Sequence, residues 1–413
     1  MKRLRIKGSR EEVNGELTLN GSKSISNRVL IIQALCGEDF EITGLSTSDD
    51  TIALQKALAS TNTTIDIGAA GTTMRFLTAY FSVFGNDALI LTGSDRMKKR
   101  PIGILVDALQ SLGANIEYEG DDGFPPLKIN GSRLKGGHLK IDATVSSQFI
   151  SALLLIASSL ENGLQLELVG NLVSRPYLEM TLNLMKFFGV NADWIGQTID
   201  IKPQKYKARK FQVEADWSAA SYHYAIVAFA KKGRLKLNGF FKESVQGDSV
   251  LSEMMEFFGV RTIFHETGIE LVKIPHQTAD FNYDFIRCPD LAQTIAVVCA
   301  GLQVQGTFSG LQTLAIKETD RTKALEVELD KMKVSFRKAN DSWEIGGETP
   351  ISSSNLAIDT YHDHRMAMAF APLSVFFDNG LIINNPDVVS KSYIYFWKDL
   401  VSLGFEVEEI LQA

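Results

Sequence analysis

The sequence is poor in cysteine. Cys36, Cys288 and Cys299 are its three cysteines among 413 residues, and each lies in an apolar run. They show neither the spacing of metal ligands nor a disulfide framework, so we expect a protein of the reducing cytoplasm. Long hydrophobic runs are missing as well. Because a membrane-spanning helix needs roughly 18 or more consecutive apolar residues, no membrane span is expected.

Basic residues are not in excess. The chain has 42 Lys and Arg residues against 49 Asp and Glu residues, a formal net charge of −7. Proteins that bind nucleic acids are usually basic, so no nucleic-acid partner is expected. An anionic ligand must therefore meet cations that the fold gathers locally against an acidic background.

One pattern of elements recurs along the chain. An amphipathic helix ends at a glycine or an equivalent residue, and a short alternating strand follows. The residues at this position are Gly113, Gly189, Gly259, Lys333 and Gly404, about 70 residues apart. Residues 52–67 form a degraded first copy, which makes six units of an internally repeated architecture. A polar, basic stretch at 202–210 separates three units from the other three, so we predict two equivalent halves with a ligand cleft between them.

Nearly every unit contains a polar or ionic helix start. The stretch 20–28 (NGSKSISNR) precedes an apolar helix, which Ser22 or Ser24 is expected to cap. Free backbone N–H groups and two cations there suit an anion. A purely structural cap with solvated cations fits this stretch equally well. Neither this loop nor the loop at 68–75 has the spacing of a phosphate-binding P-loop.

Charged side chains gather at the other helix starts. If the helices run alike, their positive ends converge on one site, where Asp290 and Glu318 are candidates for proton transfer. By itself, Asp290 also fits an ordinary residue at a helix start. His362 and His364 are two residues apart and do not share a helical face, so zinc is not expected. The cations of this set are Lys23, Arg28, Arg75, Arg96, Lys317, Arg321, Arg365 and Lys391.

The ordered set of motifs resembles the 5-enolpyruvylshikimate-3-phosphate (EPSP) synthase family over nearly the whole chain. Each motif alone is weak, but their order is specific. The motifs lie at 21–28, 70–75, 91–107, 146–149, 174–177, 216–222, 289–290, 317–321 and 363–368.

The resemblance implies an α/β (α+β) fold of two pseudo-symmetric domains, each built of three βαβαββ units. It places a discontinuous domain at 1–19 plus 215–413, an inserted domain at 20–214, and hinges near 19–21 and 213–216. The implied reaction transfers the enolpyruvyl group of phosphoenolpyruvate to the 5-hydroxyl of shikimate 3-phosphate and releases phosphate. It needs neither a metal nor an organic cofactor. A monomer is expected.

The resemblance also assigns roles to single residues. Lys23, Asp290 and Glu318 are the expected catalytic groups. The expected contacts of shikimate 3-phosphate are Lys23, Ser24, Arg28, Ser146, Ser147, Gln148, Ser174, Tyr177, Asp290 and Lys317. The expected contacts of phosphoenolpyruvate are Lys23, Gly71, Arg96, Gln148, Arg321, Arg365 and Lys391.

Some positions depart from the family pattern. Asn20 replaces a usual proline, and Ala69 and Thr313 replace usual asparagines. Gly71 keeps the glycine that is changed to alanine in glyphosate-insensitive members, so we expect glyphosate to compete with phosphoenolpyruvate. Two other functions stay open. One is the sister transferase acting on UDP-N-acetylglucosamine, which uses a loop cysteine where this chain has Asp95-Arg96-Met97. The other is a non-catalytic anion-binding relative.

Overall fold

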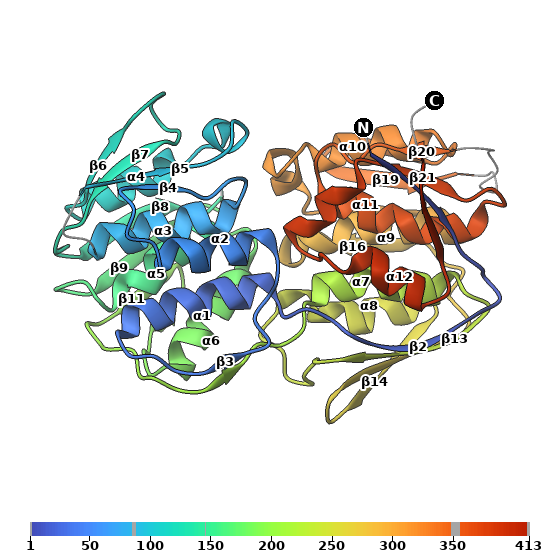
Figure 1. Cartoon of the computed structure of the whole chain (residues 1–413), viewed down its shortest axis with the longest axis horizontal. Helices are drawn as coiled ribbons and strands as arrows, with labels where there is room; N and C mark the ends of the chain where they lie inside the picture. Colours follow the sequence, from blue (N-terminus) through green and yellow to red (C-terminus); the bar gives the residue numbers. More distant parts are fainter. Residues whose placement is uncertain (1, 85–87, 145, 348–355, 411–413) are drawn as a thin grey trace. The chain divides into compact units, whose positions relative to one another are not determined.

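The computed structural model describes residues 2–84, 88–144, 146–347 and 356–410. The chain divides into two compact units. Unit 1 comprises Met1–Asn20 and Glu214–Ala413, and unit 2 comprises Gly21–Val213. Each unit is described by itself, and Figure 1 gives the labels of its elements.

Five four-stranded sheets in the described residues share one pattern of pairing. In each, a parallel pair of strands is followed by two antiparallel pairings, with helices in the connections. This is the βαβαββ repeat that the resemblance implies. In unit 2 one copy consists of β4 (Thr64–Asp66), α3 (Gly71–Val83), β5 (Leu89–Thr92), α4 (Gly103–Ser111), β6 (Asn115–Tyr118) and β7 (Leu127–Asn130). The next consists of β8 (Gly137–Asp142), α5 (Ser147–Ala157), β9 (Leu164–Val169), α6 (Arg175–Phe187), β10 (Asp193–Ile195) and β11 (Thr198–Ile201).

The remaining copy in unit 2 is smaller than predicted. Its sheet has only two parallel strands among the described residues, β3 (Ile42–Thr43) and β12 (Phe211–Gln212), and its helices are α1 (Lys23–Cys36) and α2 (Asp49–Leu58). The strand that follows α2 is β4, which pairs with β5 in the next sheet. The expected sixth unit is therefore present without the closing hairpin.

Unit 1 contains three complete sheets, and two of them take a strand from the start of the chain. In Figure 1, β2, drawn in blue, lies beside β13; the two are parallel in a register from Glu12 and Lys232 to Thr18 and Asn238. The first sheet consists of β2 (Glu12–Thr18), α7 (Trp217–Phe229), β13 (Lys232–Asn238), α8 (Leu251–Phe257), β14 (Val260–His265) and β15 (Gly268–Lys273). The second consists of β16 (Phe281–Asp284), α9 (Ala292–Leu302), β17 (Gly306–Ser309), α10 (Arg321–Asp330), β18 (Ser335–Ala339) and β19 (Ser342–Gly346). The third consists of β20 (Ala357–Ile358), α11 (His364–Phe370), β21 (Leu381–Asn384), α12 (Phe396–Ser402), β22 (Glu406–Glu409) and β1 (Arg3–Lys7).

Three central helices form the core of each unit. In unit 1, α7, α9 and α11 contact one another, and α7 packs on β13 and β15. These helices are mostly apolar or small, with polar residues mainly in their first turns, and almost every residue of each is buried. In unit 2, α1, α3 and α5 contact one another in the same way. Five of these six helices begin at or beside residues that the resemblance assigns to the site, and α7 begins within the motif at 216–222.

The helix ends confirm the repeat. Gly113, Gly189, Gly259 and Gly404 all have positive φ angles, and Lys333 takes the same left-handed conformation at φ 59°. Lys333 therefore occupies a position that favours glycine. The predicted cap of α1 is only half correct. Ser22 stands at the N-cap position, but its side chain makes no cap hydrogen bond.

The chain passes between the units twice, and Gly21 is required at the first crossing. A Cβ at Gly21 would lie 1.8 Å from the carbonyl oxygen of Gly44, which no side chain tolerates. Within unit 2, the Val213 N–H donates to the Thr43 carbonyl at 2.9 Å; within unit 1, the Asp216 N–H donates to the Asn20 carbonyl at 3.1 Å. The hinges expected near 19–21 and 213–216 concern motion and stay a prediction.

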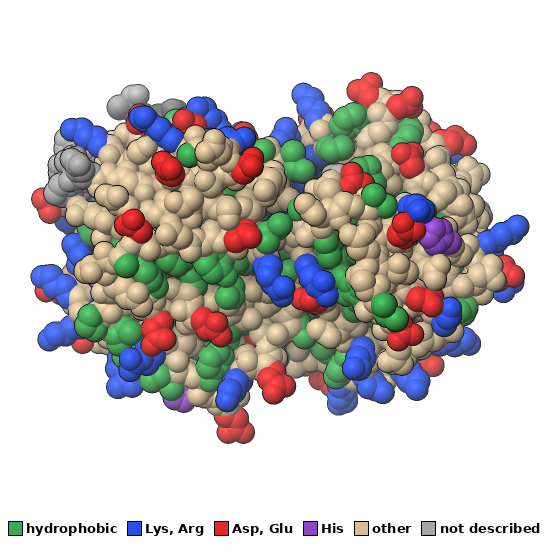
Figure 2. All heavy atoms as spheres, turned by 180° about the vertical axis from the view of Figure 1, so that it is seen from behind, with side chains coloured by type: hydrophobic (Ala, Val, Ile, Leu, Met, Phe, Trp, Pro, Cys, Tyr) green, Lys and Arg blue, Asp and Glu red, His purple; other side chains and the backbone are tan. Residues whose placement is uncertain are grey.

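Charges of both signs are mixed on the surface. Figure 2 shows Lys and Arg side chains interspersed with Asp and Glu side chains over one face. A search of the described residues for a helix with the length and apolar character of a membrane span finds none.

Candidate functional site

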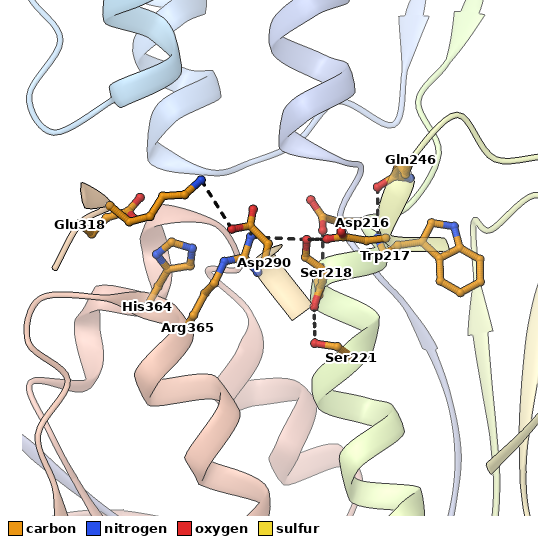
Figure 3. A network of polar contacts seen from close by, with 12 residues as sticks. Asp216, Trp217, Ser218, Ser221, Gln246, Asp290, Glu318, His364 and Arg365 are labelled. Carbon is orange, nitrogen blue, oxygen red and sulfur yellow. Dashed lines mark hydrogen bonds and ion pairs between the residues drawn. The ribbon is translucent and has the colours of Figure 1, made fainter. Parts of the chain in front are cut away.

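The starts of the three central helices of unit 1 are joined by polar contacts (Figure 3). Asp290 lies in a 3-10 turn (Pro289–Leu291) immediately before α9. Its Oδ2 accepts from Arg365 Nη2 at the start of α11, at 2.9 Å. The same nitrogen lies 3.4 Å from Ser218 Oγ at the start of α7, and the other terminal nitrogen lies 3.4 Å from the Tyr222 hydroxyl. The expected convergence of helix starts is thus present within this unit.

Arg321 connects three carboxylates. Its guanidinium donates to Asp363 at 2.7 Å, and to Asp290 and Glu318 at 2.9 Å each. Its side chain is 2% exposed. Burial opposes its charge, but the three carboxylates together raise the pKa of Arg321 above its ordinary value. Arg321 therefore fixes the two candidate proton-transfer acids, Asp290 and Glu318, to one rigid group.

Asp363 holds Arg321 and α11 at the same time. One carboxylate oxygen accepts from Arg321, while the other caps α11 by accepting the Arg365 N–H at 2.8 Å. The two residues before it, Tyr361 and His362, both have positive φ angles. Such a turn is strained for residues other than glycine, and strain of this kind concentrates at functional sites. The His362 carbonyl accepts from Lys391 Nζ at 2.7 Å, so the same turn positions a predicted ligand of phosphoenolpyruvate.

Lys317 stands at the margin of this cluster. Its Nζ lies 3.9 Å from Asp290 Oδ1. Burial lowers the pKa of Lys317, and Asp290 opposes that shift. The cluster therefore places three cations around one carboxylate.

Asp248 joins the same cluster, although it was not selected from the sequence. It lies in a 3-10 turn (Gly247–Val250) and accepts a hydrogen bond from Ser218 Oγ. Burial, followed by the charge of Asp290, raises the pKa of Asp248 to about 7. No catalytic motif surrounds it in the sequence. Its position follows from long-range packing of its turn against the start of α7.

Glu214 is the anchor for that packing. It is buried, and its carboxylate accepts hydrogen bonds from Trp217 Nε1 (2.9 Å), the Phe241 N–H (3.1 Å), Ser244 Oγ (2.6 Å) and Gln246 Nε2 (2.7 Å). Gln246 also accepts the Trp217 N–H at 3.2 Å. These bonds fix the turn that carries Asp248 to the first turn of α7.

In unit 2, Arg28 occupies the interior. Its guanidinium donates to Thr181 Oγ1 at 2.7 Å, to the Ser24 carbonyl at 2.8 Å and to Ser151 Oγ at 3.1 Å. Burial lowers the pKa of Arg28 to about 10, so it is still charged at neutral pH. Arg28 therefore holds the first turn of α1, which contains Lys23 and Ser24, against α5 and α6. Its assignment as a substrate contact stays a prediction.

The helix starts of unit 2 are also linked to each other. Gln148 Nε2 at the start of α5 lies 3.4 Å from Thr72 Oγ1 at the start of α3. Asp50 accepts from the Thr73 N–H and hydroxyl at 3.1 and 2.7 Å and from Asn27 Nδ2 at 3.1 Å, which ties α3 to α1. Asp50 was not selected from the sequence.

Gly71 makes room for an arginine. A Cβ at Gly71 would lie 2.3 Å from a terminal nitrogen of Arg100. The guanidinium of Arg100 thus packs directly on the first turn of α3. Arg100 belongs to the basic loop at 92–101, and the sequence did not separate it from solvated neighbours such as Lys98 and Lys99.

The other predicted residues of unit 2 lie at helix starts or in loops. Ser146 caps α5 by accepting the Gln148 N–H at 3.3 Å. Ser174 is buried at the start of α6 with φ 56°. Ser24, Ser147 and Tyr177 are partly buried, and Arg96 is exposed. Their roles stay predictions.

Known proteins match both the sequence and the fold. A sequence model of the family described as EPSP synthase (3-phosphoshikimate 1-carboxyvinyltransferase) matches residues 8–61 and 53–400. A 3-phosphoshikimate 1-carboxyvinyltransferase of Bacteroides fragilis (strain YCH46) is 48% identical over 401 residues, covering 96% of this chain and 97% of that protein. One of Sulfurovum sp. (strain NBC37-1) is 37% identical over 424 residues, covering 95% and 97%. The solved EPSP synthase from Acinetobacter baumannii superposes with a TM-score of 0.79 at 20% identity, covering 99% of this chain and 100% of that chain, which shows the shared fold.

Proposed function

This chain belongs to the EPSP synthase (3-phosphoshikimate 1-carboxyvinyltransferase) family, and we infer that it transfers the enolpyruvyl group of phosphoenolpyruvate to the 5-hydroxyl of shikimate 3-phosphate. Inorganic phosphate is the second product. The observation that carries this inference is the arrangement around Asp290. Two arginines hold this carboxylate at 2.9 Å each, and Arg321 also holds Glu318 at 2.9 Å. Acids held among cations suit proton transfer on anionic substrates.

Both units contribute residues in this proposal. In unit 1, the proposed contacts of shikimate 3-phosphate are Asp290 and Lys317. The proposed contacts of phosphoenolpyruvate in this unit are Arg321, Arg365 and Lys391. In unit 2, the proposed contacts of phosphoenolpyruvate are Lys23, Gly71, Arg96 and Gln148. The proposed contacts of shikimate 3-phosphate in unit 2 are Lys23, Ser24, Arg28, Ser146, Ser147, Gln148, Ser174 and Tyr177.

The proposed chemistry is an addition followed by an elimination. Asp290 accepts the proton of the 5-hydroxyl while the hydroxyl oxygen bonds to C2 of phosphoenolpyruvate. C3 gains a proton from Glu318, assisted by Lys23, and becomes a methyl group in a tetrahedral intermediate. Loss of one proton from the methyl group at C3 and departure of phosphate from C2 then restore the double bond. Protons balance, because the hydroxyl proton taken up by Asp290 leaves with the released phosphate, and the methyl group returns one proton to Glu318.

Phosphate release is the assay for this function. With both substrates present, the enzyme should release phosphate, and omission of either substrate should stop the release. UDP-N-acetylglucosamine in place of shikimate 3-phosphate distinguishes the sister transferase. Phosphate release with the nucleotide sugar but not with shikimate 3-phosphate would refute the assignment.

Isosteric variants test the two acids. Asp290→Asn and Glu318→Gln should each lower turnover by about 10²–10⁴-fold with smaller changes in KM, because each removes a proton-transfer group. Glu326→Gln is a matched control, since Glu326 lies in α10 and, within the described residues, forms an ion pair only with the surface lysine Lys323, at 2.9 Å. A nearly normal rate in either test variant would remove that acid from the scheme.

We further propose that glyphosate competes with phosphoenolpyruvate, that the enzyme is a monomer, and that it acts in the cytoplasm without nucleic acid or a membrane. Undiminished activity at high glyphosate would point to Ala69 or its neighbours as the cause of resistance.

A further inference from the structure

Asp248 is a buried carboxyl group that the proposed chemistry does not use. It is 5% exposed and accepts a hydrogen bond from Ser218 Oγ. Within the described ranges, none of the ion pairs includes Asp248. A carboxylate in this position is kept from water without direct neutralisation by a cation, and such a group tends to bind a proton.

The surroundings of Asp248 contain more acids than cations. Asp216 faces it from the start of α7, Asp290 from the turn before α9, and Arg365 from the start of α11. The thiol of Cys288 lies close enough to sense its charge, and burial raises the pKa of that thiol so that it stays neutral. Burial and the two acids outweigh Arg365 and the Ser218 hydrogen bond, so the pKa of Asp248 lies at about 7.

A short path links Asp248 to Arg365. Ser218 Oγ donates to Asp248 and lies 3.4 Å from a terminal nitrogen of Arg365. Through this path an ionised Asp248 partly offsets the positive charge that Arg365 offers to an anion. When an anion binds to Arg365, its negative charge adds to that of the acids around Asp248.

We propose that Asp248 takes up a proton from solvent when phosphoenolpyruvate binds at Arg365. The carboxylate becomes a carboxylic acid: its new O–H bond forms as an O–H bond of a hydronium ion in the solvent breaks, and no other bond of the protein changes. Asp248 is thus a positioning residue that adjusts the charge of the anion site. The proposal deepens the proposed function and rests on its assignment of phosphoenolpyruvate to Arg365.

Thermodynamic linkage determines whether the affinity for phosphoenolpyruvate rises or falls with pH. If the anion favours the protonated form of Asp248, protonation favours the anion by the same factor. Affinity for phosphoenolpyruvate therefore falls as pH rises above about 7, by up to about tenfold per pH unit. Asp248→Asn is neutral at every pH and carries an amide that can donate to Ser218 as the protonated acid would, so this fall should disappear.

The test compares KM for phosphoenolpyruvate between about pH 6 and pH 9 at saturating shikimate 3-phosphate. At about pH 8, Asp248→Asn should bind phosphoenolpyruvate about tenfold more tightly than the wild type, and near pH 6 the two should agree. The substrate phosphate titrates in this range too, but it does so equally for both enzymes and cancels in their ratio. Asp387→Asn is the control, because the side chain of Asp387 is 66% exposed and pairs with Lys2; it should follow the wild type.

Ser218→Ala provides a second arm that keeps the carboxyl group. It removes the hydrogen bond that favours ionised Asp248, so the rise in KM should begin at a higher pH than in the wild type. This arm decides the question if Asp248→Asn does not fold. The proposal would be overturned if the ratio of KM for phosphoenolpyruvate between wild type and Asp248→Asn did not change with pH, and if the pH profile of KM in Ser218→Ala were not shifted. The proposed function would stand in that case, provided that the wild type releases phosphate from the two substrates. A wild type that releases no phosphate from the two substrates would overturn the proposed function and this proposal together.

Discussion

Glu214 offers a quantitative test of how unit 1 is built. Its carboxylate accepts four hydrogen bonds, two on each oxygen. Oε1 holds Trp217 Nε1 and the Phe241 N–H, two donors for which the described part of the chain shows no other acceptor. Oε2 holds Ser244 and Gln246, which can turn or use other acceptors; Gln246 Nε2 already donates to the Ala215 carbonyl at 2.8 Å.

The contacts predict different costs for two substitutions. Glu214→Ala leaves the buried indole N–H of Trp217 and the partly buried N–H of Phe241 without an acceptor, at about 1–3 kcal/mol each, so unfolding free energy should fall by about 3–4 kcal/mol. Glu214→Gln keeps an oxygen for both donors and removes a buried charge, so the loss should be about 1 kcal/mol. For a unit the size of unit 1, the alanine variant should melt about 6–16 °C lower.

Thermal unfolding followed by circular dichroism measures this difference. The alanine variant should also lose turnover, because the turn that carries Asp248 is no longer fixed to α7. Equal melting temperatures for the alanine and glutamine variants would refute the reasoning, since that result would mean that the buried donors find other acceptors.

Further predictions follow from single contacts. Burial raises the pKa of Glu214 in the folded protein, so its protonated form is the stabilising one. The wild type should therefore lose stability relative to Glu214→Gln as pH rises from the ordinary pKa of 4.5 through the raised pKa. Melting temperatures of both proteins, measured across this pH range, would show the loss. Lys333→Gly should stabilise the protein by about 1 kcal/mol without changing turnover, because it relieves a left-handed conformation; a lower melting temperature would contradict this. Arg321→Lys should lower turnover by about 100-fold or more, because one ammonium group cannot hold three carboxylates, and a near-normal rate would show that they need no common partner. Gly71→Ala should fold normally, since only the end of the flexible Arg100 side chain must move, but it should raise KM for phosphoenolpyruvate. An unchanged KM would show that the position of Arg100 does not affect the binding of phosphoenolpyruvate.

The repeat could be read from the sequence because it is local. Helix periodicity and a left-handed residue at each helix end are properties of neighbouring residues, and they survive even where Lys333 replaces glycine. The missing hairpin of the first copy could not be read in this way. The strand after α2 has the right composition to close its own sheet, and only pairing with β5 assigns it to the next one.

The charged residues of the site were recognisable for a similar reason. Asp290, Arg321 and Arg365 stand at helix starts, where polar groups interrupt apolar runs. Supporting residues lacked such a signal. Asp50 and Asp248 look like ordinary turn or cap residues, and their contacts with Thr73 and Ser218 join segments about 20 to 30 residues apart in the chain. Packing, and not local pattern, determines those contacts.

Product analysis after reaction in D2O is the most direct test of the central claim. Addition followed by elimination passes through a methyl group at C3, so a solvent deuteron that enters there can remain when a proton is removed. Proton NMR of the product should show deuterium in the enolpyruvyl methylene group, with inorganic phosphate formed in equal amount. A product with an undeuterated methylene group, or no enolpyruvyl product from phosphoenolpyruvate and shikimate 3-phosphate, would contradict the account.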